Sequence, residues 1–168
     1  MQLIEVDKAR YRRHLNITIT AAVIAFASLG VGLSTLLIHW FGTAPGENFW
    51  LNLLGVAIAA ALVGKTLQQL KSRPWFYEIA YVWQLKQELN QINRRLRAIQ
   101  AAVKADHQDA IIVMLFNYHG SRQLWLLDDN VLNLQELEVQ LQQLQQQIQR
   151  LDLTVKLTDY HRALLDKF

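Results

Sequence analysis

The residues with the clearest potential for catalysis lie in one polar stretch of the second half of the chain. Tyr118 and His119 are followed there by Asp128 and Asp129. A histidine near carboxylates can serve as a general base, so one hypothesis is a hydrolase that uses His119 and Asp128. No nucleophile elbow, phosphate-binding glycine loop or second histidine accompanies them. We therefore prefer a polar loop with a capping aspartate, and we expect a protein that is not an enzyme.

Metal and cofactor chemistry have equally little support in the sequence. The five histidines are His14, His39, His107, His119 and His161, and no two of them are four residues apart. They form no recognisable ligand cluster. The chain has no cysteine, which removes disulfides, thiolate metal sites and thiol catalysis. We expect no metal, no cofactor and no small-molecule substrate.

Three neighbouring arginines, Arg94, Arg95 and Arg97, could attract the phosphates of nucleic acid or lipid. The charge distribution offers a simpler role for them. Residues 65–105 carry eight basic and two acidic side chains, whereas residues 106–168 carry nine acidic and five basic ones. We expect the arginines to pair with the acidic half. Nucleic acid is not expected as a partner, because no recognised binding module surrounds the cluster.

Two apolar segments follow a basic segment over residues 1–14. They are the first of the elements that must position these residues. Residues 15–38 contain no charged side chain, and a helix needs roughly 20 apolar residues to cross a bilayer. We predict transmembrane helices over 15–41 and 49–70, joined by a short periplasmic loop over 42–48. A cleaved signal peptide is the alternative, but the first apolar segment is too long and a second one follows it.

Basic residues predict how these segments are oriented. Four basic side chains precede the first segment, and Lys65, Lys71 and Arg73 lie at or after the end of the second, whereas the loop has only Glu47. Positive charge stays on the cytoplasmic side, so both termini should be cytoplasmic, with Lys65, Lys71 and Arg73 at the lipid headgroups. Neither segment has a charged residue at its centre, which disfavours a transporter or pump.

Small residues recur at a spacing of four within both segments, and such spacing lets helices approach closely in lipid. They either pack the two helices against each other or assemble separate copies of the chain. These residues are Ala21, Ala25, Ser28 and Gly32 in the first segment and Gly55, Ala59, Ala60 and Gly64 in the second.

Two heptad patterns follow, over helices predicted at about 75–105 and 134–156. Alternating spacings of three and four are typical of helices that pair along an apolar seam. We prefer a cytoplasmic antiparallel helical hairpin in which a basic helix meets an acidic one, and a parallel coil between subunits is the alternative. The first seam comprises Val82, Leu85, Leu89, Ile92, Leu96, Ile99 and Val103, and the second comprises Leu134, Leu137, Leu141, Leu144, Ile148, Leu151 and Val155.

The middle segment, residues 106–130, permits either a helix or a β-hairpin with Gly120 at its turn. A shared helical face for Phe116, Gly120, Leu124 and Leu127 favours a helix. We expect this segment to be the interaction tip of the hairpin. Asn133, followed by Glu136, predicts the cap that begins the second seam helix.

The chain resembles an uncharacterised family of small two-span proteins from gammaproteobacteria. The resemblance covers nearly the whole chain and rests on the N-terminal run DKARYRRHLN, the two apolar segments and the later run FNYHGSRQLWLLDDN. It implies a bacterial inner membrane and a domain of unknown function. No functional residue can be transferred from it.

The sequence thus predicts an all-α membrane protein with a transmembrane hairpin and a cytoplasmic helical domain over 71–168. Our main hypothesis is a non-enzymatic scaffold or accessory subunit, oligomeric or part of a larger complex, whose partners are lipids and other helices. A membrane-tethered signalling module, with Pro74 coupling the spans to the seams, is the second hypothesis.

Overall fold

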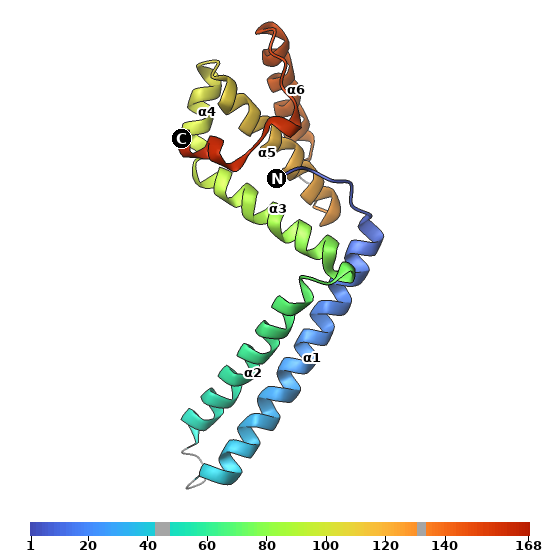
Figure 1. Ribbon diagram of the computed structural model, residues 1–168, viewed down its shortest axis with the longest axis vertical. Coiled ribbons are helices and arrows are strands. Elements are labelled where there is room, and N and C mark those ends of the chain that lie inside the picture. Colours follow the sequence, from blue (N-terminus) through green and yellow to red (C-terminus); the bar gives the residue numbers. More distant parts are fainter. Residues whose placement is uncertain (43–47, 131–133) are drawn as a thin grey trace. The chain divides into compact units, whose positions relative to one another are not determined.

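The computed structural model describes residues 1–42, 48–130 and 134–168, and every regular element among them is helical. The chain divides into two compact units, which are described separately below. The apolar unit comprises residues Ala9–Ala80, and the core unit comprises Met1–Lys8 and Tyr81–Phe168. The elements are α1 (Lys8–Phe41), α2 (Phe49–Leu70), η1 (Pro74–Phe76), α3 (Tyr77–Arg94), α4 (Leu96–Lys104), α5 (Gln108–Leu127), α6 (Leu134–Arg150), η2 (Leu157–Asp159) and η3 (Arg162–Lys167) (Figure 1).

The apolar unit is built on α1 and α2, which lie side by side in Figure 1. Both helices are long and apolar enough to cross a bilayer, so the prediction of two such helices is confirmed. Helix α1 begins at Lys8, earlier than the segment predicted from Leu15. Most of the loop predicted over 42–48 lies outside the described residues.

Helix α5 forms the centre of the core unit. Eleven of its 20 residues are buried, including the consecutive run from Ala110 to Asn117. Helices α4 and α6 and the turns η2 and η3 all contact it. The helical alternative for the middle segment is therefore confirmed, and α5 lies at the centre of the core unit rather than at the tip of a helical hairpin. A run of apolar residues that covers all sides of a helix is buried by neighbours on all sides.

The first seam packs as predicted on its apolar side, although its helix is not continuous. Val82, Leu85, Leu89, Ile92 and Ile99 are buried, whereas Leu96 and Val103 are half-buried. Helix α3 ends at Arg94 and α4 begins at Leu96, so the single helix predicted over 75–105 is corrected to two.

The second seam is shorter than predicted. Leu137 and Leu144 are buried, and Leu134, Leu141 and Ile148 are half-buried. The helix predicted over 134–156 ends at Arg150, so Leu151 and Val155 lie beyond it. Asp152 adopts a left-handed φ of 51°, and the Leu153 amide donates to the Ile148 carbonyl oxygen, which is how many helices end. The predicted cap at Asn133 lies outside the described residues.

The two seams meet α5 instead of forming a two-helix hairpin of their own. Among the described residues, α4 and α6 each contact α5 more extensively than they contact each other. On the α3 side, a Cβ placed on Gly120 of α5 would lie 3.1 Å from Leu89 and 3.2 Å from Leu85. The predicted direct pairing is thus corrected, because the middle segment packs against the helices of both seams.

The C-terminal segment closes the core unit through Tyr160. Its ring stacks on Phe116 with centroids 3.9 Å apart, and its hydroxyl donates to Oε1 of the buried Glu88 at 2.7 Å. Burial, together with the hydrogen bond to this carboxylate, raises the pKa of Tyr160 far above its usual value. A carboxylate of α3 is thereby paired with a tyrosine 72 residues away in the chain.

We expect Tyr160→Phe to lower the free energy of unfolding by about 1–3 kcal/mol, because Glu88 loses its buried donor. The wild type should also lose stability as the pH rises above about 10, since the unfolded tyrosine then loses its proton while the folded one keeps it. Denaturant unfolding at several pH values measures both effects, with Tyr77→Phe, at a 60% exposed tyrosine, as the control. Equal pH slopes for the wild type and Tyr160→Phe would contradict this role.

Candidate membrane interface

The two apolar helices make their closest contact at small residues. Gly30 and Ser34 of α1 are buried, as are Gly55 and Ala59 of α2. A Cβ placed on Gly55 would lie 2.5 Å from Oγ and 2.7 Å from the backbone nitrogen of Ser34. The Ser34 hydroxyl also donates to the backbone oxygen of Asn52 at 3.3 Å. Such close van der Waals contact is what holds helices together in lipid.

This contact uses part of the predicted small-residue set. Gly55 and Ala59 lie at it, but their partners are Gly30 and Ser34, which sequence reasoning missed. The predicted pair Ser28 and Gly32 has the same spacing two positions earlier. Spacing alone shows that a helix has a small-residue face, but it does not show which face turns toward the neighbour.

The remaining predicted small residues lie elsewhere on the two helices. Ser28 and Gly32 of α1 are exposed and lie four residues apart on one side of the helix, and we name them the outer small-residue face. Ala60 of α2 is also exposed. No atom of the described residues lies within 4 Å of a Cβ placed on Gly32 or Gly64. Ala21 and Ala25 line an apolar groove beside α2.

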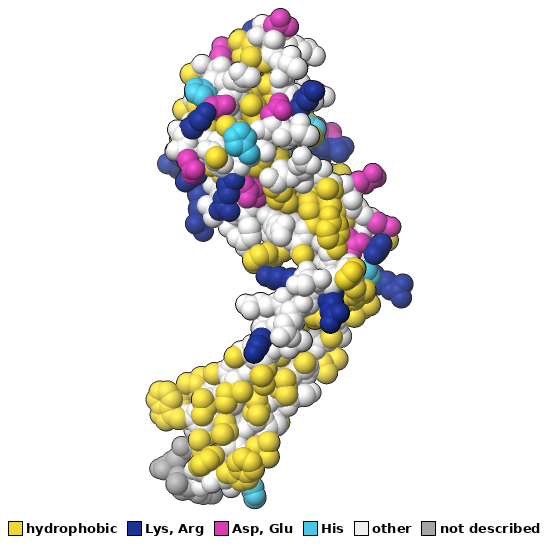
Figure 2. Space-filling model, viewed as in Figure 1, with side chains coloured by type: hydrophobic (Ala, Val, Ile, Leu, Met, Phe, Trp, Pro, Cys, Tyr) yellow, Lys and Arg dark blue, Asp and Glu magenta, His cyan; other side chains and the backbone are white. Residues whose placement is uncertain are grey.

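The outer surface of the two helices is apolar over most of their length. Val31 is 70% exposed and Trp50 is 74% exposed. Figure 2 shows hydrophobic side chains over this surface, with basic side chains toward the end at which α1 begins. Lys65, Lys71 and Arg73, the residues predicted to contact headgroups, are exposed. At the other end, Trp40, Phe41 and Phe49 are exposed, which is typical of an interfacial aromatic belt.

A buried ionic cluster lies at the junction after α2. Glu78, in the first turn of α3, accepts from Nε of Arg10 at 2.9 Å, and its other oxygen lies 3.4 Å from Nδ1 of His14. The His14 ring lies against Trp75, with centroids 4.6 Å apart. The side chains of Glu78 and His14 are only 11% and 12% exposed. Sequence reasoning missed this cluster, although Glu78 is one of only two acidic residues within 65–105.

The structure does not bring His119 and Asp128 together. They are nine positions apart at the end of α5, which corresponds to about 13.5 Å along a helix axis and to opposite faces. His119 is half-buried, and burial together with Arg122 lowers its pKa. Asp128 accepts from Nζ of Lys86 at 2.8 Å. Over residues 1–42, 48–130 and 134–168, no cluster of three or more metal-ligating side chains occurs.

The basic arginine cluster has one member with contacts to the acidic half. Arg95 donates to the Leu165 carbonyl oxygen at 2.8 Å, and its guanidinium lies 3.8 Å from Asp166. Arg94 and Arg97 are exposed. Ion pairs also join Lys86 to Asp128 and Lys8 to Asp129, whereas Arg150 pairs with Asp106 at 2.8 Å within the acidic half. The predicted pairing of the two halves therefore describes Arg95 and Lys86 rather than the whole cluster.

The family described as "Protein of unknown function (DUF3087)" matches residues 1–165. Neither the curated proteins nor the solved structures contain a match to this chain.

Proposed function

Because the chain belongs to DUF3087, a family of unknown function, we propose its role from its own structure. It is an integral membrane protein that works through helix–helix contacts as a scaffold or accessory subunit. The observation that carries the proposal is the surface of α1 and α2. Large apolar side chains are exposed along both helices, whereas the core unit buries most of its own around α5. An apolar surface along two whole helices needs lipid or other helices to cover it.

The proposed location is a bacterial inner membrane with both termini in the cytoplasm. The exposed Lys65, Lys71 and Arg73 and the basic start of α1 support this orientation through the positive-inside rule. The exposed aromatic residues at the opposite ends of α1 and α2 support it as well. The core unit then lies on the cytoplasmic side, available to other proteins.

The outer small-residue face supports assembly into an oligomer. Gly55 and Ala59 already hold α1 against α2, so Ser28 and Gly32 are not needed for that contact. Small residues on a lipid-facing helix surface allow a second copy to approach closely. The same face would serve a different subunit of a larger complex.

We expect Gly32→Leu to reduce assembly without weakening the contact between α1 and α2. The added side chain meets no described atom of its own chain within 4 Å of the Cβ, but it would separate two copies that meet at this face. Native mass spectrometry of gently solubilised membranes measures stoichiometry and bound subunits. A loss of about 1–2 kcal/mol of association free energy would appear as a five- to thirtyfold weaker complex.

The matched control is Val31→Leu, a change at a neighbouring residue that is 70% exposed and already large. It should leave the complex intact. A wild-type chain that is strictly monomeric and captures no subunit would overturn the scaffold proposal. Unchanged assembly in Gly32→Leu would instead exclude this face.

A second candidate function is a membrane-tethered regulatory module, which the cluster of Arg10, His14, Trp75 and Glu78 supports. It ties the beginning of α1 to the first turn of α3 through Glu78. A change in the two apolar helices would then reach α3 through this cluster and through Pro74.

We expect Glu78→Gln to loosen this junction, because the buried carboxylate that pairs with Arg10 and lies beside His14 is lost. Amide hydrogen exchange in the first turns of α1 and α3 should accelerate about fivefold, equivalent to about 1 kcal/mol. Exchange around Gly55 should stay unchanged, and Glu138→Gln, at a 51% exposed side chain, is the control. Unaltered exchange at the junction would count against the regulatory role.

A further inference from the structure

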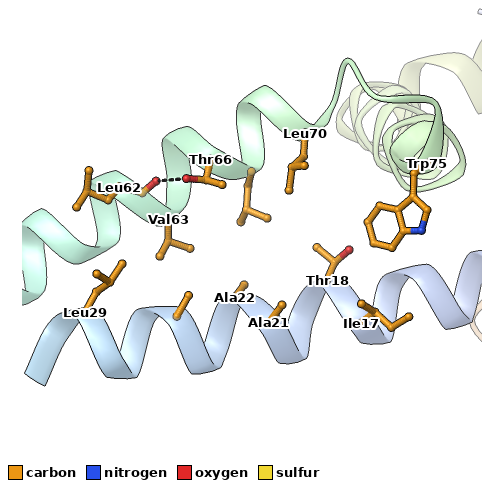
Figure 3. Close-up of a pocket in the computed structure, with 12 residues that line it drawn as sticks. Ile17, Thr18, Ala21, Ala22, Leu29, Leu62, Val63, Thr66, Leu70 and Trp75 are labelled. Carbon is orange, nitrogen blue, oxygen red and sulfur yellow. Dashed lines mark hydrogen bonds between the residues drawn. The ribbon is translucent and has the colours of Figure 1, made fainter. Parts of the chain in front are cut away.

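An apolar groove lies between α1 and α2, toward the N-terminal end of α1. Its volume is about 260 Å³. Figure 3 shows side chains of both helices projecting toward the space between them, with Trp75 at one end. The walls include Ala21, Ala22 and Ala25 of α1 and Leu62, Val63 and Leu67 of α2. Three of the six α1 residues that line the groove are alanines, whose short side chains leave space in front of α2.

The chemistry of the lining favours an apolar occupant. Only two side chains in the lining carry a hydroxyl group, Thr18 and Thr66. Thr18 donates to the His14 backbone oxygen at 2.8 Å, and Thr66 donates to the Leu62 backbone oxygen at 2.9 Å. Both hydroxyl protons are therefore used within their own helices, and neither calls for a polar ligand.

The size of the groove favours a thin occupant over a second helix. An α-helix with its side chains is at least about 10 Å across, so it would cover the open side of the groove without entering the space between two packed helices. A hydrocarbon chain has no such limit. The groove therefore fits an acyl chain better than a helix of a second copy.

Positive charge is concentrated at the end of the groove that Trp75 closes. Arg13 precedes the lining residue Ile17 by one helical turn and so lies on the same face of α1. Arg73 stands between the lining residues Leu70 and Trp75 in the chain. Both arginines are exposed. Basic side chains at this level of a membrane attract anionic headgroups.

We propose that this groove is a binding site for one acyl chain of an anionic phospholipid, whose phosphate is held by Arg13 and Arg73. The site rests on the proposed membrane location and adds a specific ligand to it. General lipid contact would show no preference among headgroups. This site, by contrast, would bind anionic headgroups preferentially at one place on the surface.

Tryptophan quenching by lipids with brominated acyl chains tests the site. Two versions of the full chain are needed, one retaining only Trp75 and the other only Trp50, with phenylalanine replacing the other tryptophans. Each is reconstituted in phosphatidylcholine vesicles containing a small fraction of brominated phosphatidylglycerol or of brominated phosphatidylcholine. We expect brominated phosphatidylglycerol to quench Trp75 at a lower lipid fraction than brominated phosphatidylcholine does. Both lipids should quench Trp50, which is 74% exposed, to the same extent.

Two kinds of variant identify the residues responsible. Arg13→Gln and Arg73→Gln leave the lining untouched, and each should reduce the preference for phosphatidylglycerol about fivefold. Ala22→Leu fills the groove and should abolish the preference, whereas Val23→Leu, at a 61% exposed residue, should preserve it.

The outcomes separate this inference from the proposed function. If both lipids quench Trp50 but Trp75 shows no preference, the groove is not an anionic lipid site although the protein is in the membrane. If neither lipid quenches Trp50, the membrane proposal itself fails. A preference that survives both arginine variants overturns the headgroup assignment, and Ala22→Leu altering stoichiometry instead of quenching would show that a second copy occupies the groove.

Discussion

Replacing Phe116 with alanine should lower the free energy of unfolding of the core unit by about 3–5 kcal/mol. The ring is fully buried on α5, and it stacks on Tyr160 at 3.9 Å with an interplanar angle of 13°. Its removal leaves a cavity at the point where α5 meets the C-terminal segment. It also takes away the surface that orients Tyr160 toward Glu88. The effect is the largest we expect from a single substitution, since total stabilities of domains are about 5–15 kcal/mol.

Thermal unfolding followed by far-UV circular dichroism measures this loss. The midpoint should fall by more than about 10 °C for a unit of this size. Val139→Ala, at an α6 side chain that is 53% exposed, is the control and should change the stability by less than about 0.5 kcal/mol. Similar midpoints for the two variants would show that α5 is not the centre of the core unit.

Gly55→Leu should separate α1 from α2 and is the second large effect we expect. A Cβ at this position already lies 2.9 Å or less from three atoms of Ser34, two of them in the backbone. Backbone atoms cannot rotate away as a flexible side chain would, so one helix must shift. Overpacking of this kind costs about 1–3 kcal/mol and can cost more. Thermal unfolding of the full chain in a mild detergent measures the loss.

Gly64→Leu is the matched control on the same helix, because no described atom lies within 4 Å of a Cβ placed there. Both substitutions remove a helical glycine and gain the same helix propensity, about 0.5–1 kcal/mol. Their difference therefore isolates the contact with Ser34. Equal stability of Gly55→Leu and Gly64→Leu would rule out close packing of α1 and α2 at Gly55.

Several features of the fold could be predicted because they depend on local sequence. Long uncharged segments predicted two apolar helices, and spacings of three and four predicted which side of α3 is buried, as Leu85 and Ile92 are. The helical face shared by Phe116 and Gly120 favoured a helix for the middle segment. Each of these predictions needs only the periodicity of one helix.

The partners of these faces could not be predicted in the same way. The seam patterns predicted that Leu89 and Leu144 are buried, and both are. The helices that carry the two seams, however, pack against α5 and not against each other. A heptad pattern indicates how much apolar surface a helix must bury, whereas the surface that covers it depends on every other segment of the chain. The helix ends at Arg94 and Arg150 were also missed, because the heptad patterns continue past both of them.

Helices α1 and α2 show most clearly what the sequence determines and what only the tertiary structure decides. The sequence by itself determined that these helices are apolar, uncharged at their centres and rich in small residues. Only the tertiary structure decided that Gly55 meets Ser34, that Ser28 and Gly32 remain exposed, and that alanines opposite leucines leave a groove. The physical reason is that a spacing of four identifies a helix face, whereas the rotation and crossing point of two helices determine which face is covered.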